Sequence, residues 1–112
     1  MTNVDAQLDA LGDRTRRTVF TRLREGPRSV GQLSAGLDVS RSAVSQHLRV
    51  LKDAGLVSDR PEGTRRVYSV DRSALAAVRE WLDGFWDQAL TTFRTAAEAE
   101  AATRRSGEKE PS

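Results

Sequence analysis

The sequence predicts a mainly α-helical fold that contains one small β-hairpin and ends in an unusually long helix. Apolar residues recur every three or four positions through most of the chain, which is the spacing of amphipathic helices. This spacing changes once, after Gly55, where β-type residues flank the turn sequence "PEGT". From residue 72 the helical spacing returns and continues for about six turns.

Two helices are expected at the start of the chain. The first covers residues 4–11 and ends at Gly12, and the second covers about residues 14–24. Asp13 is placed to cap the second helix, and the Gly-Pro pair at 26–27 ends it. The apolar residues expected to face inward from these two helices are Val4, Leu8, Leu11, Val19, Phe20 and Leu23.

A third and a fourth helix follow, joined by the short connection "LDV". Ser29 and Gln32 have the capping-box spacing and predict the start of a short helix. Ser40 caps the next helix, which runs to about Ala54 and stops at Gly55. Inward-facing residues are expected to be Val30, Leu33 and Leu37 in the third helix and Val44, Leu48 and Leu51 in the fourth.

The second half of the chain is predicted to contain the hairpin and the long helix. The segments "LVSDR" and "RRVYSV" form the two strands, with inward-facing residues expected at Leu56, Tyr68 and Val70. Asp71 caps the last helix, about 72–102. The charged segment "RRSGEKEPS", 104–112, is expected to be disordered, which leaves residues 1–103 as one domain.

The composition argues against several classes of protein. The chain has no cysteine and one histidine, His47, so disulfides, thiolate metal sites and thiol nucleophiles are excluded and no metal site is predicted. Neither a glycine-rich phosphate loop nor a cluster of carboxylates and histidines is present, so we expect neither an enzyme nor a cofactor. The N-terminal residues do not resemble a signal peptide, and no apolar stretch approaches a membrane span. A cytoplasmic location is therefore expected.

Positive charge is concentrated in the middle of the chain. Residues 14–70 carry twelve arginines and lysines against five acidic residues, a net charge of +7, whereas both ends are mildly acidic. A basic middle favours a polyanionic partner for this part of the chain. An arginine-rich surface that is merely solvated is the alternative interpretation.

The third and fourth helices have the arrangement of a helix-turn-helix, in which the second helix enters the DNA major groove. The buried stripe of the fourth helix leaves five residues free whose side chains can bind base edges or phosphates, namely Arg41, Ser42, Ser45, Gln46 and Arg49. The capping residues Ser29 and Ser40 lie where backbone N–H groups can also meet phosphate. The hairpin that follows carries three arginines around its loop, Arg60, Arg65 and Arg66. Their alternative role is to keep an exposed strand edge soluble.

These segments resemble the ArsR family of bacterial winged-helix repressors. The resemblance rests on "ALGDRTRRTVFTRL", "VSRSAVSQHLRVLKDAGLV" and "RPEGTRRVYSV", and it covers about residues 5–95. It implies a homodimer that represses transcription at a palindromic operator, with the five free residues of the fourth helix at the operator and Arg65 and Arg66 in the wing. Metal-sensing members carry a cysteine pair where this chain has Ser29 and Gly31, so the resemblance does not imply metal sensing here.

The last helix carries more apolar residues than a small domain can cover. Its stripe and one residue of the first helix are predicted to form a dimer interface, which would consist of Leu8, Leu75, Val78, Leu82, Phe85, Trp86, Ala89 and Phe93. The alternative is that the stripe forms an intramolecular core. A small organic effector could enter near the dimer interface, although the sequence identifies none.

Two functions remain open at this point. The first is a dimeric, sequence-specific regulator, expected to be a repressor, with double-stranded operator DNA as its partner. The second is a winged-helix module that binds an acidic protein through the same basic face. The salt dependence and sequence preference of binding would separate them.

Overall fold

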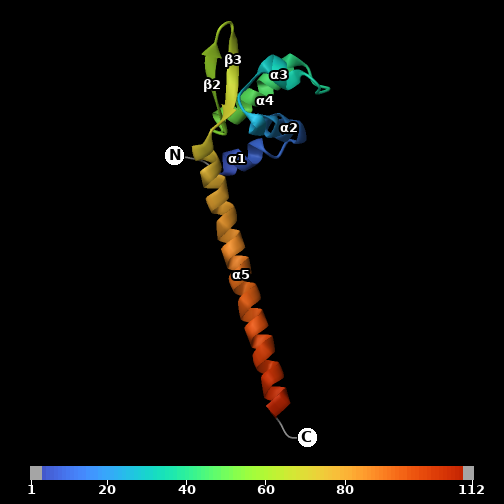
Figure 1. Ribbon diagram of the computed structural model, residues 1–112, viewed down its shortest axis with the longest axis vertical. Coiled ribbons are helices and arrows are strands. Elements are labelled where there is room, and N and C mark those ends of the chain that lie inside the picture. The colour runs from blue at the N-terminus through green and yellow to red at the C-terminus, as the bar shows by residue number, and fades with distance from the viewer. Residues whose placement is uncertain (1–3, 110–112) are drawn as a thin grey trace. The chain divides into compact units, whose positions relative to one another are not determined.

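The computed structural model describes residues 4–109 (Figure 1). Its elements in chain order are α1 (Val4–Ala10), α2 (Arg14–Arg22), the 3-10 turn η1 (Leu23–Glu25), β1 (Arg28–Ser29), α3 (Val30–Ser34), α4 (Arg41–Asp53), β2 (Val57–Glu62), β3 (Arg65–Val70) and α5 (Arg72–Lys109). The predicted mainly α-helical fold with a small hairpin and a long last helix is confirmed. The chain divides into two compact units at residues 79/80, within α5, and each is described separately. The sequence did not predict this division.

Each of the four predicted N-caps is present. Side-chain oxygens of Asp13, Ser29, Ser40 and Asp71 accept hydrogen bonds from backbone N–H groups two or three residues further on, at 2.8–3.4 Å. Gln32 completes the capping box by accepting the Ser29 N–H at 2.9 Å. Caps of this kind each contribute about 1 kcal/mol, and they fix where the short helices begin.

Gly55 ends α4 as predicted. Its φ of +81° is a left-handed conformation that suits glycine. The Gly55 N–H donates to the Lys52 carbonyl and the Leu56 N–H donates to the Leu51 carbonyl, both at 2.9 Å, which is a Schellman motif. The motif turns the chain sharply, so β2 begins one residue after the buried side chain of Leu56.

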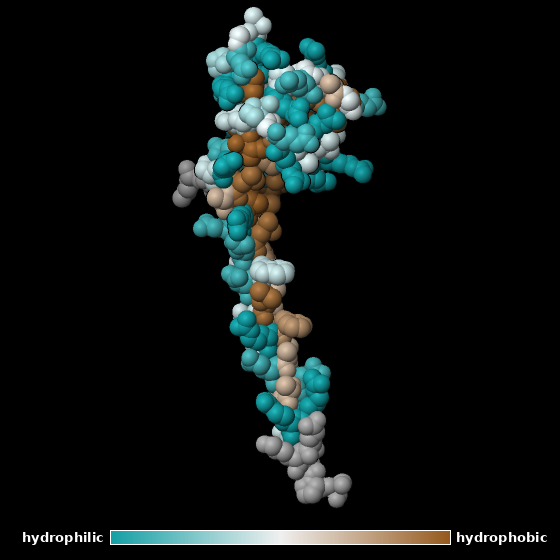
Figure 2. Space-filling view, in the orientation of Figure 1, coloured by the Kyte–Doolittle hydropathy of each residue, from teal (hydrophilic) through white to brown (hydrophobic). Residues whose placement is uncertain are grey.

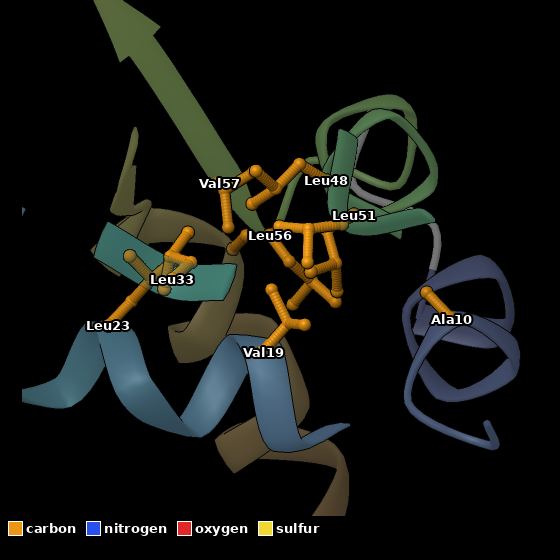
Figure 3. Close-up of a cluster of buried hydrophobic side chains, with 10 residues drawn as sticks. Ala10, Val19, Leu23, Leu33, Leu48, Leu51, Leu56 and Val57 are labelled. Atoms are coloured by element: carbon orange, nitrogen blue, oxygen red, sulfur yellow. The ribbon is translucent and has the colours of Figure 1, made fainter. Parts of the chain in front are cut away.

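One hydrophobic cluster holds the first unit together, and Figure 3 shows its side chains meeting between α2, α3, α4 and β2. The predicted stripe of α4 is confirmed, because Val44, Leu48 and Leu51 are fully buried. The other buried members of the cluster are Ala10, Val19, Leu23, Leu33, Leu56, Val57 and Ala74. This packing fixes which face of α4 is left for solvent.

The sheet has three antiparallel strands in the order β1-β3-β2. The predicted hairpin is confirmed, but its turn consists of Gly63 and Thr64, so Pro61 and Glu62 of the expected turn belong to β2. The three residues expected to face inward here do so to different degrees. Leu56 is fully buried in the cluster, whereas Tyr68 and Val70 pack against it and remain partly exposed. The short strand β1, which pairs with β3, was not predicted.

The C-terminal helix differs from the prediction in length. α5 continues to Lys109. The predicted helix ended near residue 102, and residues 104–112 were expected to be disordered. The ion pair between Glu100 and Arg104, four residues apart at 3.7 Å, favours the helix in this region. Residues 1–3 of the predicted domain and 110–112 of the predicted tail lie outside the described residues. No helix in the described part of the chain is long and apolar enough to cross a membrane.

Candidate nucleic-acid interface

The exposed face of α4 presents a row of polar side chains opposite its buried stripe. Ser42, Gln46 and Arg49 follow one another at intervals of four and three residues, so they share one face of the helix. Their side chains are exposed, as is that of the neighbouring Ser45. The buried stripe and the N-cap at Ser40 together hold this row in place. Such a row can donate to and accept from base edges in a major groove.

Arg41 begins α4 and lies across α3. A Cβ atom built on Gly31 would stand 3.2 Å from Arg41 Nη2 and 3.4 Å from its Cζ. The guanidinium therefore rests over a helix position that has no side chain. Arg41 forms no ion pair with any described residue, and it remains exposed.

A hollow of about 480 Å³ brings Arg41 together with the wing, the β2–β3 hairpin that Figure 1 shows projecting beside α3 and α4. The residues that line this hollow come from β1, α3, the turn after it, α4 and β3, and they are Ser29, Val30, Gly31, Gln32, Ala35, Arg41, Arg65 and Arg66. No acidic residue lines the hollow, and the charges of Arg41 and Arg65, which form no ion pair with any described residue, give it a positive potential suited to a phosphate. The structure thus collects four predicted site residues, Ser29 among them, in one place.

Asp59 of β2 connects the wing to α4. Its Oδ1 lies 2.8 Å from Lys52 Nζ and its Oδ2 lies 2.9 Å from Arg66 Nη1, while its side chain is only 8% exposed. The hydrogen bond from Lys52 lowers the pKa of Asp59 below its ordinary value, burial opposes this shift in part, and Arg66 adds to it. We call these three residues the wing clamp, which no motif or spacing in the sequence predicted.

The side chains of the two predicted wing arginines leave β3 in opposite directions, although both residues line the hollow beside Arg41. Neighbouring residues of a strand point to opposite faces, and Arg66 shares its face with Asp59, to which it is bound. Arg65 is exposed and forms no ion pair with any described residue. Arg66 therefore differs from Arg65, because its charge is already paired with that of Asp59. Arg60 also has an acidic neighbour, because its Nη2 lies 3.5 Å from Glu62 Oε2.

Two other predicted site residues, Ser29 and Ser40, cap helices and differ in exposure. The Ser29 hydroxyl accepts from the Gln32 N–H within the capping box, and the residue is only 5% exposed. Ser40 caps α4 but stays exposed. His47 is half-buried, and its charge contributes to lowering the pKa of Asp13, after the larger effect of the Arg16 backbone N–H.

The predicted dimer residues differ in how much of each side chain is exposed. Leu75 packs against the hydrophobic cluster and Val78 is 9% exposed, so these two belong largely to the core of their own unit. Leu8 is half-buried. The other five, Leu82, Phe85, Trp86, Ala89 and Phe93, are exposed on α5, with Trp86 at 66% and Phe93 at 73%.

Apolar side chains follow one face of α5 after residue 80, and Figure 2 shows this stripe in brown. Trp81 and Phe85 contact each other edge to face, with ring centroids 4.7 Å apart, and Leu90 extends the stripe. Large apolar groups exposed in a continuous row mark an interaction surface. Among the described residues, no group of three acidic or histidine side chains is arranged to hold a metal ion.

Comparison with known proteins gives a consistent assignment. The model of the family described as bacterial regulatory protein, arsR family, matches residues 13–59, from the cap of α2 into the wing. The HTH-type transcriptional regulator Rv2034 of Mycobacterium tuberculosis is 54% identical over 96 residues, which cover 86% of this chain and 90% of that protein. The transcriptional repressor SdpR of Bacillus subtilis is 30% identical, covering 68% of this chain and 84% of that protein. The transcriptional activator HlyU of Vibrio cholerae is 35% identical, covering 73% and 76%.

A solved structure shares the fold as well. The ArsR-like transcriptional regulator from Rhodococcus sp. RHA1 superposes with a TM-score of 0.67 at 29% identity, covering 84% of this chain and 92% of that one. The matched segment contains α4 and the clamp residues Lys52 and Asp59. The chain belongs to the arsR family of bacterial regulatory proteins and is a DNA-binding transcriptional regulator of the winged helix-turn-helix type, not an enzyme.

Proposed function

We propose that this regulator is a cytoplasmic homodimer that binds a palindromic operator and represses transcription by occupying it. The observation that carries the proposal is the exposed polar row of α4, held beside a basic wing by the clamp through Asp59. When the recognition helix and the wing are fixed relative to each other, the helix can read bases while the wing binds the DNA phosphate backbone.

Base reading is assigned to the start of α4. Arginine binds guanine O6 and N7 with two hydrogen bonds, and glutamine binds adenine N6 and N7 in the same way. Arg41 and Gln46 supply these two groups, and Ser42, Ser45 and Arg49 surround them. Arg65 is the wing residue that we assign to phosphate, because no described residue neutralises it.

The homodimer is supported by the exposed stripe of α5. Six large apolar side chains there, Trp81, Leu82, Phe85, Trp86, Leu90 and Phe93, are 42–73% exposed, and covering them would remove apolar area from water at about 25 cal/mol per Å². A second copy offers an identical stripe, which is what a two-fold interface requires. Two copies would also present two α4 helices to the two halves of a palindrome.

Selection of operators from random duplex DNA and from DNA upstream of the gene tests the proposal. We expect one palindromic sequence to be enriched, with half-sites about 10 base pairs apart or a multiple of that distance. Replacing Arg41 or Gln46 by alanine should cost about 1–3 kcal/mol at this operator and relax one base position. Placing the operator over a promoter should then reduce transcription when the regulator is present.

Binding without sequence preference, or preference for an acidic protein over DNA at the same ionic strength, would contradict the proposal. Increased transcription at the selected operator would contradict repression alone and leave the DNA-binding assignment intact.

A further inference from the structure

A second basic hollow, outside α4 and the wing, lies along the exposed face of α2. It has a volume of about 740 Å³ and is lined by Arg14, Arg17, Thr18, Thr21, Arg22, Glu25 and Arg28. Four arginines face one acidic residue there, and Arg28 pairs with that residue, Glu25, at 2.8 Å. The net charge of the lining is therefore strongly positive, and none of its residues belongs to α4 or the wing.

Two of the four arginines that line this hollow are held by hydrogen bonds to backbone carbonyls. Arg17 donates from Nη1 to the Leu11 carbonyl at 2.9 Å, and Arg22 donates from Nη1 to the Ala35 carbonyl at 2.7 Å. Hydrogen bonds to carbonyls leave the positive charge uncompensated while they restrict the side chain. Arginines fixed in this way lose less conformational entropy when an anion arrives.

This hollow adjoins the one beside α4 at two points. Arg22 lines the α2 hollow and binds the carbonyl of Ala35, which lines the other. Arg22 Nη2 also lies 3.4 Å from where a Cβ of Gly36 would stand, so its guanidinium sits against the turn between α3 and α4. In addition, Arg28 of the α2 hollow directly precedes Ser29 of the hollow beside α4 in β1.

We propose that α2 binds the phosphate backbone of the DNA that flanks the half-site read by α4. This inference rests on the proposed operator binding, because the DNA held at the hollow beside α4 is the polyanion that would continue into the α2 hollow. The nine residues of α2 rise about 13 Å, which corresponds to about four base pairs at 3.4 Å each. The regulator would therefore need flanking DNA of any sequence for full affinity.

The substitution Arg14→Gln tests this with little structural risk. Arg14 is exposed and forms no ion pair with any described residue. Arg24→Gln is the matched control, because it removes the same charge from the neighbouring η1 but does not line either hollow. Both variants are titrated by fluorescence anisotropy at 50–200 mM salt on two duplexes, one limited to the selected operator and one extended by ten base pairs at each end. Thermal unfolding checks that both are folded.

On the extended duplex, Arg14→Gln should make the slope of log affinity against log salt shallower by about one unit. Between 50 and 200 mM salt, the affinity of the wild type should therefore fall about 3.5-fold more than that of the variant. On the limited duplex it should match the wild type, and Arg24→Gln should match the wild type on both. Wild-type slopes for Arg14→Gln on the extended duplex would overturn the inference while operator binding stands. Equal losses for both variants, or equal losses on both duplexes, would also overturn it. A wild type that selects no operator would instead overturn the proposed function itself.

Discussion

Gly31 gives Arg41 its position, because the guanidinium lies where a larger residue at 31 would place its side chain. A methyl group there would stand 3.2 Å from Arg41 Nη2, so the flexible end of the arginine would have to move by a few tenths of an ångström. The Gly31→Ala variant should therefore weaken operator binding by less than the 1–3 kcal/mol expected for Arg41→Ala. Its thermal stability should stay unchanged or rise, because alanine favours helix over glycine.

A double-mutant cycle measures whether the effect passes through Arg41. In the Arg41→Ala background, adding Gly31→Ala should change operator affinity no further. Additive losses would show that position 31 acts on DNA independently of the arginine.

Gln7 of α1 is a polar residue whose burial has a cost. It is fully buried, and neither its Nε2 nor its Oε1 has a hydrogen-bond partner within the described structure. An unpaired buried amide costs about 1–3 kcal/mol, whereas methionine has a similar length and no such requirement. Gln7→Met should raise the free energy of unfolding by about 1 kcal/mol or more in urea titrations at matched protein concentration. An unchanged or lower value would show that the amide finds a partner in the functional assembly.

The wing is an element whose two arginines should behave differently. Arg65→Gln should weaken binding to operator and to random DNA alike and make the salt slope shallower by about one unit. Arg66→Gln removes a partner of Asp59 and should change the slope less, because that guanidinium is already bound at 2.9 Å. Equal slope changes for the two variants would mean that DNA displaces Asp59 from Arg66.

The wing clamp also makes a testable contribution to acid stability. The pKa of Asp59 is lowered in the folded protein, chiefly by Lys52, from an ordinary value of 3.8. Its stabilising effect is therefore complete above about pH 4 and is lost as the pH falls through the lowered value. Asp59→Asn should be less stable than the wild type at neutral pH, and this difference should shrink progressively as the pH falls below 3.8. Thermal melts of both proteins from pH 2.5 to 7 measure the difference, and a constant gap would contradict the ionic role.

The elements that the sequence predicted are those governed by local chemistry. The caps at Asp13, Ser29, Ser40 and Asp71 and the stop at Gly55 act within a few residues, so their positions were correct. The stripe of α4 follows from helical spacing alone. Strand β1 was missed because it has two residues and forms only through its pairing with β3, about 40 positions away.

The site was predicted less completely than the fold for the same reason. The polar row of α4 follows from the buried stripe, but the clamp at Asp59 depends on the fold bringing Lys52 and Arg66 together. Ser29 was predicted at the DNA because backbone N–H groups at a helix start can meet phosphate, and the structure adds that its own N–H and its hydroxyl are both bonded to Gln32. Opposite directions of adjacent wing residues could have been expected from strand alternation.

At the scale of the whole molecule, operator affinity should depend on residues that never touch DNA. Trp86 is 66% exposed near the middle of the α5 stripe, and a fully buried side chain of this kind contributes about 1.5–3 kcal/mol. Trp86→Ala should weaken the homodimer with little effect on the fold of the first unit, since the residue lies in the second. Its loss in operator affinity should become smaller at higher protein concentration, because mass action restores the dimer.

The central proposal for this regulator is that two copies each read one half of a palindrome through α4. The most direct test combines sedimentation with titration of full and half operators by the wild type and by Trp86→Ala. We predict a wild-type dimer that binds the full operator far more tightly than the half operator, because two half-sites one DNA turn apart, roughly 34–36 Å, would engage both recognition helices. Trp86→Ala should lose this advantage at low concentration while it binds the half operator like the wild type. A wild-type monomer that binds full and half operators equally tightly would contradict the account.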